Sequence, residues 1–591
     1  MGQKQSKDEA GVQVVNIKRR EDALNVYPDS ITNQSERPLS TSTDQKNTTS
    51  TDTTDSAVTQ SGNMIEAVVG EAKDFKDGHM QEVEVGDQKV LLVKEDGSFY
   101  AIGNKCTHYG APLSKGAYCK GVVRCPWHGA CFNVKTGDIE DFPGLDSVQK
   151  FQVEVKDGKV LVRADPAALE NSKRVKPMVK KSSDNNKTVV LIGGGPASVV
   201  CAETLRQEGF TGKIVLVTRE TALPYDRIKL SKALSIKPEE IALRNKDFYD
   251  SHDIELKLNT EATKIVPSEK KVELQDGHSL KYDTLVIATG GQPRLLPIPG
   301  ADLKNVYTLR TPQDANAIAE NSHGKNVVIM GSSFIGMEVA AFLADKAASV
   351  SVVDLVQVPF QLTLGQELGT HMKQMHEGKG VKFYFDTSVK EFKGEDGKLT
   401  EAVLANGTVL PADVCVMGVG VVPATNVLKD SGLELTPRGF VTVNKNMRTN
   451  IPDIYAAGDI VEFPLFIANN QQANVQHWQM AHQHGKIAGL SIAGKAQDIH
   501  SVPYFWTVQY GKSIRYAGYG PGYDDIILHG DVDDNKFVAF YTKNETVVAV
   551  ASLGWDPIVS QAAELMSKGG VIKKDDIKSD PDNWVSKLCT L

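Results

Sequence analysis

Two short apolar runs, each followed at once by a glycine-containing turn and a helix-like segment, stand out in the pattern of hydrophobic and polar positions. Residues 189–192 read Val-Val-Leu-Ile, and residues 327–330 read Val-Val-Ile-Met. Apolar runs without alternation are typical of strands buried on both faces, as in parallel sheets covered by helices. The pattern therefore predicts two α/β units in the middle of the chain.

The N-terminal part of the chain follows a different pattern. Over residues 63–164, short runs such as 88–94 and 151–155 alternate with Gly and Asp turns, which predicts a small antiparallel β domain. Residues 1–62 are rich in Thr, Ser, Asp, Asn and Gln and bury too little apolar surface to offset the entropy lost on ordering, so we expect a disordered tail. Residues 165–187 contain many lysines and no hydrophobic period, which is typical of a linker.

Composition narrows the class of protein. The 591 residues suffice for several domains, and the 41% hydrophobic and 24% charged residues are ordinary for a globular protein. A formal net charge of -8 provides no basic field, so nucleic acid is not an expected partner. Seven cysteines do not make the dense framework of a secreted domain, and no apolar stretch reaches the length of a membrane span, so we expect an intracellular protein.

A pair of Cys/His motifs in the β domain is the first candidate for chemistry. Cys106 and His108 form C-x-H, and after sixteen residues Cys125 and His128 form C-x-x-H. Such residues could hold a structural zinc ion, although zinc sites usually place two Cys in one loop and two His in the other. One Cys and one His in each loop resembles the Rieske pattern, in which a [2Fe–2S] cluster has two Cys on one iron and two His on the other.

The first apolar run leads into a dinucleotide-binding pattern. Gly193 permits a tight turn, and Gly195 lets a pyrophosphate approach the N-terminus of the following helix, whose free N–H groups favour anions. The next predicted strand, residues 213–218, ends near Glu220, which is placed to accept hydrogen bonds from a ribose.

The second apolar run leads into a weaker copy of this pattern. Gly331 and Gly336 flank a turn in which Ser333 replaces the middle glycine, and its side chain would crowd a pyrophosphate. The following strand ends at Asp354, whose carboxylate would bind a free ribose 2′-hydroxyl and repel a 2′-phosphate. The second unit is therefore expected to favour NADH over NADPH.

Two further segments suggest that the first unit binds a flavin and the second a nicotinamide. Residues 284–290 form a predicted strand that ends in a Gly turn, and residues 449–459 form another that ends at Gly458 and Asp459. The second segment resembles a flavin-family motif in which the Asp binds the ribityl chain. The expected division is an FAD-binding domain in two parts, 188–311 and 441–500, an inserted NAD-binding domain, 312–440, and a C-terminal domain, 501–591.

Over residues 188–500 the chain resembles the pyridine-nucleotide disulfide oxidoreductase superfamily, and more narrowly its ferredoxin-reductase and apoptosis-inducing-factor branch. The narrower resemblance rests on residues 223–232 (Leu-Pro-Tyr-Asp-Arg-Ile-Lys-Leu-Ser-Lys), 477–481 (His-Trp-Gln-Met-Ala) and 503–506 (Pro-Tyr-Phe-Trp). With a Rieske domain ahead of the reductase, the chain is similar to the Rieske-containing members of that branch. The resemblance implies a multidomain fold: a small antiparallel β Rieske domain, two Rossmann-like α/β domains and an α+β C-terminal domain of the reductase dimerisation type. It implies FAD, a [2Fe–2S] cluster and NAD(H) as cofactors.

The resemblance also implies roles for individual residues. It places Arg227 and Lys232 against the flavin and pairs Lys232 with Glu338 as the catalytic residues, although such a pair can also be a simple surface ion pair. It places Trp478 and Trp506 near the isoalloxazine, although Trp is also common in cores. The expected cofactor-binding residues are Gly193, Gly195, Pro196, Ala197, Glu220, Arg227, Lys232, Ala288, Thr289, Gly290, Gly331, Gly336, Glu338, Asp354, Gly420, Gly458, Asp459, Trp478 and Trp506.

The expected function is NADH-dependent electron transfer through FAD to the Rieske cluster and on to an unidentified acceptor. No C-x-x-x-x-C motif follows Gly195, so no redox disulfide is available to take electrons from the flavin. Comparison with high-potential Rieske proteins implies a low cluster potential, because Ala130 and Phe132 stand where those proteins aim hydroxyl groups at the cluster. The alternative is a pro-apoptotic interaction protein that senses NADH or redox state with low turnover.

The first residues of the chain bear on its location. Met1-Gly2-Gln3-Lys4-Gln5-Ser6 matches the myristoylation pattern with Gly2 as acceptor, although a polar tail can fit so short a motif by chance. A single acyl chain would give only reversible membrane attachment. A cytoplasmic, membrane-associated location and a mitochondrial one both stay open, and the expected C-terminal domain is compatible with a homodimer.

Overall fold

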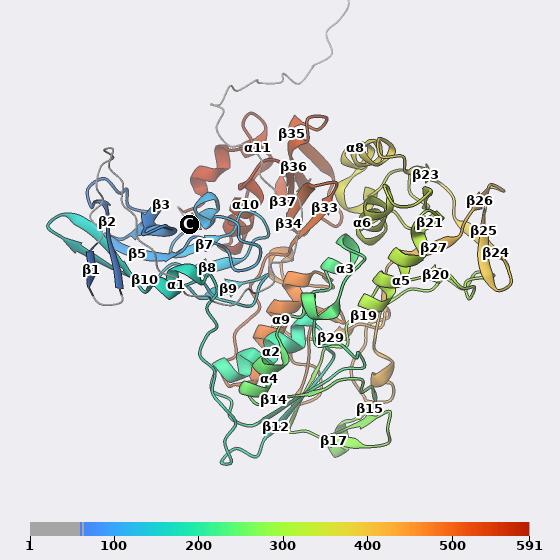
Figure 1. The fold of residues 1–591 in the computed structure, drawn as a ribbon, viewed down its shortest axis with the longest axis horizontal. Helices are drawn as coiled ribbons and strands as arrows, with labels where there is room; N and C mark the ends of the chain where they lie inside the picture. The colour runs from blue at the N-terminus through green and yellow to red at the C-terminus, as the bar shows by residue number, and fades with distance from the viewer. Residues whose placement is uncertain (1–58, 62–63, 590–591) are drawn as a thin grey trace, which may run out of the picture. The chain divides into compact units, whose positions relative to one another are not determined.

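The computed structural model describes residues 59–61 and 64–589. Residues 1–58 of the expected tail, including the acylation motif at Gly2, are not among the described residues. The described residues belong to one compact unit, within which a β domain, two α/β domains and an α+β domain follow one another along the chain (Figure 1).

The β domain contains two antiparallel sheets. Leu91, Ile102 and Phe132 are fully buried beneath the two Cys/His loops, the second of which connects β7 to β8. One sheet has the order β1-β2-β11-β10-β5-β4-β3 and the other β6-β7-β8-β9. The strands are β1 (Thr59–Ser61), β2 (Met64–Glu71), β3 (His79–Val85), β4 (Gln88–Glu95), β5 (Ser98–Gly103), β6 (Ala117–Cys119), β7 (Val122–Arg124), β8 (Cys131–Asn133), β9 (Ile139–Asp141), β10 (Lys150–Lys156) and β11 (Lys159–Ala164).

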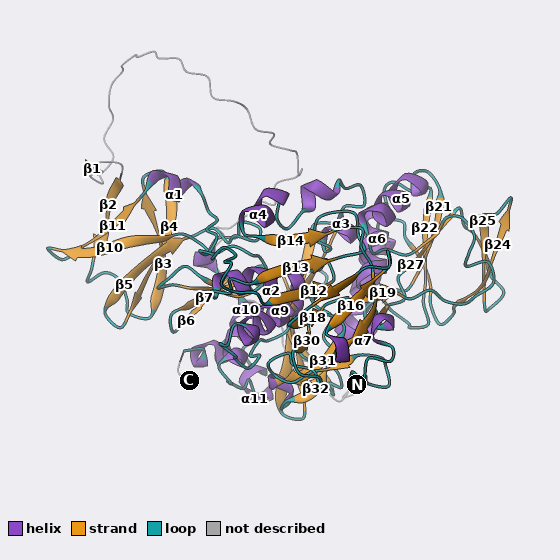
Figure 2. Ribbon diagram, turned by 90° about the horizontal axis from the view of Figure 1, so that it is seen from below, coloured by secondary structure: helices purple, strands orange, loops and turns teal. Residues whose placement is uncertain are grey.

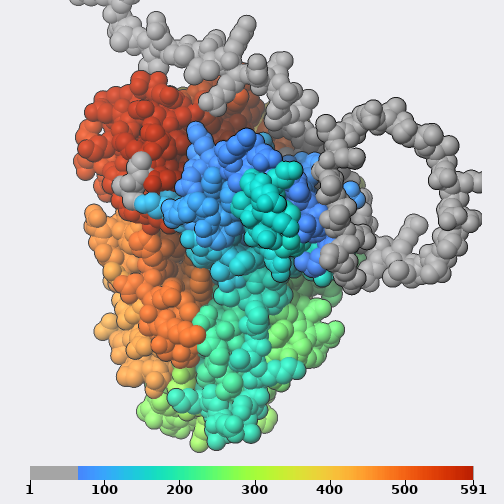
Figure 3. Space-filling model, turned by 90° about the vertical axis from the view of Figure 1, so that its left-hand side faces the viewer, coloured from blue at the N-terminus to red at the C-terminus, as the bar shows by residue number. Residues whose placement is uncertain are grey.

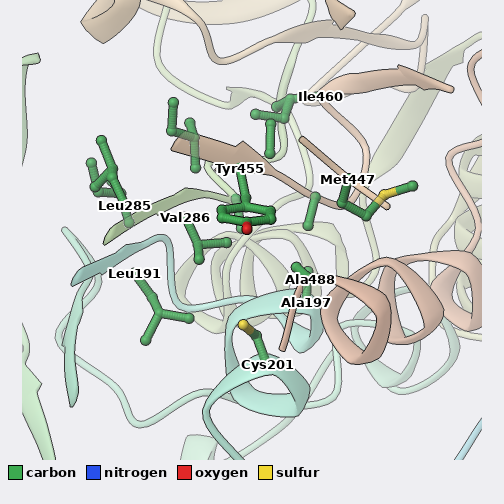
Figure 4. Close-up of a cluster of buried hydrophobic side chains, with 14 of the residues drawn as sticks. Leu191, Ala197, Cys201, Leu285, Val286, Met447, Tyr455, Ile460 and Ala488 are labelled. Atoms are coloured by element: carbon green, nitrogen blue, oxygen red, sulfur yellow. The ribbon is translucent and has the colours of Figure 1, made fainter. Parts of the chain in front are cut away.

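The first α/β domain is built from two separate segments of the chain. Its parallel sheet has the order β14-β13-β12-β18-β30, and β30 arrives only after the second α/β domain is complete. Figure 2 shows helices α2 and α9 beside this sheet, and Figure 4 shows their Cys201 and Ala488 in the same core as Leu191, Leu285 and Tyr455. The elements are β12 (Thr188–Ile192), α2 (Pro196–Gln207), β13 (Lys213–Val217), α3 (Lys229–Lys232), α4 (Lys246–Ser251), β14 (Ile254–Lys257), β15 (Ala262–Val266), β16 (Lys271–Leu274), β17 (Ser279–Lys281), β18 (Thr284–Ile287), β29 (Val441–Thr442), β30 (Ile454–Ala456), β31 (Val461–Leu465), β32 (Gln471–Ala473) and α9 (Trp478–Ile492).

The second α/β domain repeats the same design. Its parallel sheet has the order β20-β27-β21-β22-β23, and a three-stranded antiparallel sheet, β24-β25-β26, accompanies it. The pair β19-β28 connects the two α/β domains. The elements are β19 (Gly291–Pro293), β20 (Val306–Tyr307), α5 (Pro312–Ser322), β21 (Asn326–Met330), α6 (Phe334–Leu343), β22 (Ser349–Val353), α7 (Gln361–Leu364), α8 (Gln366–Glu377), β23 (Lys382–Tyr384), β24 (Val389–Glu395), β25 (Lys398–Leu404), β26 (Val409–Pro411), β27 (Val414–Met417) and β28 (Val421–Pro423).

The C-terminal domain is a five-stranded antiparallel sheet with α10 packed on it. The strand order is β33-β34-β37-β36-β35, and its core includes Trp584, Phe540 and Leu565. Its residues, red in Figure 3, lie directly beside those of the β domain, which are blue. The elements are β33 (Tyr504–Gln509), β34 (Lys512–Gly518), β35 (Asp525–Asp531), β36 (Lys536–Lys543), β37 (Thr546–Leu553), α10 (Ile558–Ser567) and α11 (Lys574–Ile577).

Three short elements extend beyond the segments expected from the sequence. β1 pairs with β2 although its residues belong to the expected tail, and β20 joins the second α/β sheet although it precedes residue 312. Within the expected linker, Asp165 caps the one-turn helix α1 (Pro166–Glu170) by accepting from the Ala167 N–H. Main-chain hydrogen bonds and a local cap stabilise such pieces without an apolar period, so hydrophobic patterning does not detect them.

No helix within residues 59–61 and 64–589 combines the length and apolarity needed to cross a membrane. The seven cysteines all lie in this part of the chain, and they are free thiols. Cys119 donates to the Leu588 carbonyl and Cys589 to the Tyr118 carbonyl, so the end of the chain is attached to the β domain.

Candidate electron-transfer site

The two Cys/His loops have the same backbone hydrogen bonds. The Cys106 N–H donates to the Ala111 carbonyl (2.9 Å), and the Cys125 N–H donates to the Ala130 carbonyl (2.7 Å). In both loops the glycine four residues after the Cys donates back to the Cys carbonyl. The loops therefore present their Cys and His side chains in matching positions, and the structure brings all four together.

The four side chains form two pairs. The Nδ1 atoms of His108 and His128 lie 3.1 Å apart, and the thiols of Cys106 and Cys125 are in hydrogen-bonding contact. Paired ligands suit a binuclear cluster, in which each iron takes two protein ligands, whereas a structural zinc ion takes four around one centre.

The surroundings of these side chains also fit a cluster. Burial lowers the pKa of His108 to about 3, and burial together with the charges of His108 and Arg515 lowers the pKa of His128 well below its ordinary value. Both imidazoles are therefore neutral, as metal ligands must be. The backbone N–H groups of His108 and Tyr109 point at the Cys106 sulfur, as those of Trp127 and His128 do at the Cys125 sulfur. Such donors stabilise thiolate and bridging sulfur.

A cavity of about 770 Å³ lies between the two α/β domains and the C-terminal domain. Its size and mixed polar and apolar walls suit a dinucleotide cofactor. Of the residues expected to bind cofactor, Gly331, Gly336 and Asp354 do not line it. The others all do: Gly193, Gly195, Pro196, Ala197, Glu220, Arg227, Lys232, Ala288, Thr289, Gly290, Glu338, Gly420, Gly458, Asp459, Trp478 and Trp506.

The backbone conformation of each dinucleotide loop requires a glycine at its first position. Gly193 has φ +120° and Gly331 has φ +97°, a region that side chains disfavour. A Cβ on Gly193 would lie 2.2 Å from the Ala288 carbonyl oxygen, and one on Gly331 would lie 2.5 Å from the Gly418 carbonyl oxygen. Each loop therefore turns tightly against the neighbouring strand end, which leaves its helix N-terminus open to a phosphate.

Asp354 is bonded to its own loop. Its carboxylate accepts from the Ser332 N–H (2.6 Å), the Ser332 hydroxyl (2.7 Å) and the Leu355 N–H (2.7 Å). These bonds draw the side chain towards the turn, which explains why it is not on the cavity wall.

Lys232 and Glu338 meet inside the protein, as the resemblance implied. The Lys232 ammonium lies 2.9 Å from a Glu338 oxygen that also accepts from Ser231, and the other oxygen accepts from the Thr507 hydroxyl at 2.8 Å. Glu338 is only 4% exposed, so the two residues do not form a surface ion pair. The carboxylate holds the lysine at the cavity wall.

Other charged residues line the same cavity. Arg227 is bonded to Glu220 (2.6 Å), and Arg310 lies close enough to Arg227 and Asp459 to interact with their charges. Burial raises the pKa of Asp459, and the two guanidinium groups oppose that rise. Sequence reasoning missed Arg310, Thr507 and Phe505 as site residues. A signal was available for Phe505, which belongs to the motif over residues 503–506, and for Thr507, which directly follows it.

Trp506 connects the cavity with the Cys/His loops. Its ring lines the cavity and lies 4.2 Å from the His128 ring and 5.5 Å from the His108 ring, measured between centroids. Trp506 is 8% exposed, so the contact is shielded from water. Trp478 lines the same cavity but packs on His482.

A buried polar interface holds the β domain against the reductase domains. Arg124 lies between Asp141 (3.1 Å) of its own domain and Glu564 (3.0 Å) of α10. Asp141 also accepts from Gln479 (2.8 Å) and Gln483 (2.7 Å) of α9. The Cys/His loops thus have a fixed position beside the cavity.

Comparison with known proteins agrees with this geometry. Residues 66–152 match the model of the Rieske [2Fe–2S] domain, residues 187–485 that of pyridine nucleotide-disulphide oxidoreductase, and residues 504–588 that of the reductase C-terminal domain. The chain is 50% identical over 519 residues to apoptosis-inducing factor 3 of Mus musculus and of Homo sapiens, which covers 87% of this chain and 86% of each relative. The crystal structure of the covalent putidaredoxin reductase–putidaredoxin complex is similar with a TM-score of 0.65 and 28% identity, over 68% of this chain and 98% of that one.

Fold and site together define a reductase that combines a flavin, a nicotinamide nucleotide and an iron–sulfur centre. The chain belongs to the pyridine nucleotide-disulphide oxidoreductase family. It is an NAD(P)H-dependent flavoprotein oxidoreductase with a Rieske domain. The sequence-based predictions of family, fold class, cofactors and reductase activity are confirmed.

Proposed function

We propose that the protein transfers electrons from NADH through FAD to a [2Fe–2S] cluster held by Cys106, His108, Cys125 and His128 of the same chain. The position of Trp506, in contact with both the cavity and the histidine pair, carries this proposal. When bound, FAD accepts a hydride from NADH and releases single electrons, which is the unit that a [2Fe–2S] cluster accepts.

The side chains around the cavity would contribute binding and electrostatics. The N-terminus of α9, at Trp478, lies on the cavity wall, and its unpaired N–H groups favour negative charge there. Lys232, fixed by Glu338, would orient the nicotinamide against the flavin. Trp506 would exclude water from the route between the cavity and the histidine pair.

The solved reductase complex joins a reductase to putidaredoxin. In the present chain an iron–sulfur domain is part of the same polypeptide and is fixed beside the cavity. We therefore propose that the internal cluster is the first acceptor and that a further partner, still to be identified, takes electrons from it.

Anaerobic stopped-flow addition of NADH to the cofactor-loaded protein tests this proposal. Flavin absorbance and the EPR signal of the cluster are followed together. Flavin bleaching followed by a rhombic signal of a His-ligated [2Fe–2S] centre supports the internal relay. A long-lived reduced flavin beside an oxidised cluster refutes it and favours the alternative of an NADH-sensing interaction protein.

The variant Trp506→Leu tests the route itself. Removing the ring should slow cluster reduction about tenfold, equivalent to about 1.4 kcal/mol in the barrier, while flavin reduction by NADH continues. Trp506→Phe keeps an aromatic ring, so cluster reduction should slow less than in Trp506→Leu. Equal rates of cluster reduction in all three proteins would show that electrons take another path.

Membrane attachment through Gly2 and a homodimer stay predictions. Mass spectrometry of the protein expressed with an N-myristoyltransferase would show whether Gly2 is acylated. Sedimentation of the loaded protein would give its oligomeric state. Fractionation of cells would decide between the membrane-associated and mitochondrial locations.

A further inference from the structure

Arg515 is a buried cation of the C-terminal domain that reaches the second Cys/His loop. It lies on β34 and is 4% exposed. Its Nε donates to the Trp127 carbonyl at 3.0 Å, between the two residues Cys125 and His128 of that loop. A guanidinium remains charged at all physiological pH values, so the contact places a permanent positive charge beside the loop.

Other side chains of the C-terminal domain hold this loop without adding charge. The Ser560 hydroxyl donates to the Cys125 carbonyl at 2.8 Å, and the Tyr504 ring covers Gly129. The Tyr504 hydroxyl lies 3.2 Å from the Ser560 oxygen. The position of the loop therefore does not depend on Arg515 alone, whereas the charge that this domain brings to the loop backbone comes from Arg515.

The counter-charge of Arg515 lies on its far side. One terminal nitrogen of the guanidinium is 3.1 Å from the Asp556 carboxylate, while the Nε faces the loop. Burial raises the pKa of Asp556, and Arg515 opposes that rise. Two other cations near the loop have carboxylate partners. Lys232 is bonded to Glu338, and Arg124, which donates to the Gly129 carbonyl at 2.9 Å, is paired with Asp141 and Glu564. Arg515 thus turns the positive end of an ion pair towards Cys125 and His128.

This positive charge lies close to both ligands of the loop. Trp127, whose carbonyl accepts from Arg515, directly precedes His128 and follows Cys125 by two residues. A cation in this place favours additional negative charge at the ligands.

We propose that Arg515 raises the reduction potential of the Rieske cluster from the neighbouring domain and so makes electron transfer from the flavin more favourable. Reduction adds one negative charge to the cluster, and a buried cation stabilises that charge more than it stabilises the oxidised state. The benefit for electron transfer rests on the proposed function. The reduction potential itself is an equilibrium property of the cluster and can be measured separately. Arg515 is a positioning and tuning residue, since it acts through the loop.

Potentiometric titration of the loaded full-length protein tests the proposal. The titration is done at pH 8 with mediators and dithionite, and the EPR signal of the cluster is the readout. In Arg515→Gln the ratio of reduced to oxidised cluster at a given potential should fall about tenfold, which is about 59 mV for a one-electron couple. Arg515→Lys keeps the charge and should stay within about threefold of the wild type. Asp556→Asn removes the counter-charge and should shift the ratio in the opposite direction, towards the reduced form.

Ser560→Ala is the matched control, because it removes a hydrogen bond to the loop and leaves every charge in place. Its ratio of reduced to oxidised cluster at a given potential should stay within about threefold of the wild type. If Ser560→Ala and Arg515→Gln lower the potential equally, or if Arg515→Lys lowers it as far as Arg515→Gln, the role of Arg515 is structural and the proposal is wrong. If Arg515→Gln does not retain the cluster, an unchanged potential in Asp556→Asn overturns it. The titration uses no NADH, so its outcome is independent of the stopped-flow test of the relay.

Discussion

The pair Lys232–Glu338 is the clearest case of two distant residues that act as one unit. In Glu338→Gln the amide can still bond Ser231 and Thr507, but the ammonium loses its counter-charge and moves from its position at the cavity wall. We expect flavin reduction by NADH to slow about tenfold, equivalent to about 1.4 kcal/mol in the barrier. Stopped-flow flavin absorbance measures this rate.

Lys246→Met is the control for that variant. Lys246 pairs with Asp250 on the surface, where both side chains are more than half exposed, so its removal should leave flavin reduction unchanged. An unchanged rate in Glu338→Gln would mean that the buried pair serves stability alone.

Asp354 allows a test of nucleotide preference. Its charge repels a 2′-phosphate whether or not its oxygens are bonded to Ser332. Asp354→Asn should therefore raise kcat/KM for NADPH relative to NADH by about tenfold, or about 1.4 kcal/mol. Ser332→Ala removes one hydrogen bond and keeps the carboxylate, so it should retain the preference of the wild type. Steady-state kinetics with an artificial electron acceptor decide between these outcomes.

The sequence predicts site residues where a local motif surrounds them. The four Cys and His stand in two short loops whose spacing resembles the Rieske pattern, and Gly193 directly follows an apolar strand. Arg310 and Arg515 belong to segments without a motif, and they gain a role only where separate domains meet. Asp354 shows the opposite case. Its motif predicts a cofactor-binding residue, but its side chain is bonded to Ser332 and does not line the cavity.

Helix α8 carries a histidine whose titration should affect stability. In His376, Nε2 donates to the Gln509 side-chain oxygen (2.7 Å) and Nδ1 accepts from the Tyr510 hydroxyl (2.9 Å), so the ring is neutral. Burial lowers its pKa to about 4. An unfolded histidine titrates near 6.5, so between pH 6.5 and 4 the unfolded chain binds a proton that the folded chain does not.

Stability should therefore fall as the pH decreases through this window, by at most about 1.4 kcal/mol per pH unit for this one group. Melting temperatures between pH 7 and 4.5 should decrease less steeply in His376→Gln than in the wild type. The slope should not vanish, because His477, His482 and His484 are also buried with lowered pKa values. His278 is 83% exposed in its side chain, so His278→Gln serves as the control with an unchanged slope. Parallel curves for His376→Gln and the wild type would contradict the prediction.

Elements with a strong pattern could be predicted, and short ones could not. β12 and β21 have four buried residues in a row because each is covered on both faces, and the sequence displays this as an apolar run. β1 and β20 have two or three residues and depend on main-chain hydrogen bonds to a neighbouring strand, which leave no trace in side-chain pattern.

At the scale of the whole molecule, Arg124 forms a buried ion pair between the Rieske domain and α10. Arg124→Met would leave Asp141 and Glu564 buried without their cation, and loss of one partner from such a group costs about 3–5 kcal/mol. We expect a lower melting temperature and faster proteolysis of the Rieske domain. Lys213→Met breaks an exposed pair with Glu255 and should change stability by less than about 1 kcal/mol. Equal melting temperatures for the two variants would show that Arg124 does not hold the domains together.

The buried contact between Trp506 and the histidine pair also bears on how the rate of electron transfer depends on protein concentration and ionic strength. Two separate proteins must collide before an electron passes, so their rate falls on dilution and changes with ionic strength. Here the donor and acceptor sites share one chain and one interior surface, and their effective concentration is fixed by the fold. The internal step should therefore proceed at the same rate in a dilute, salty solution as in a crowded one, and only the outgoing step should depend on the supply of partner.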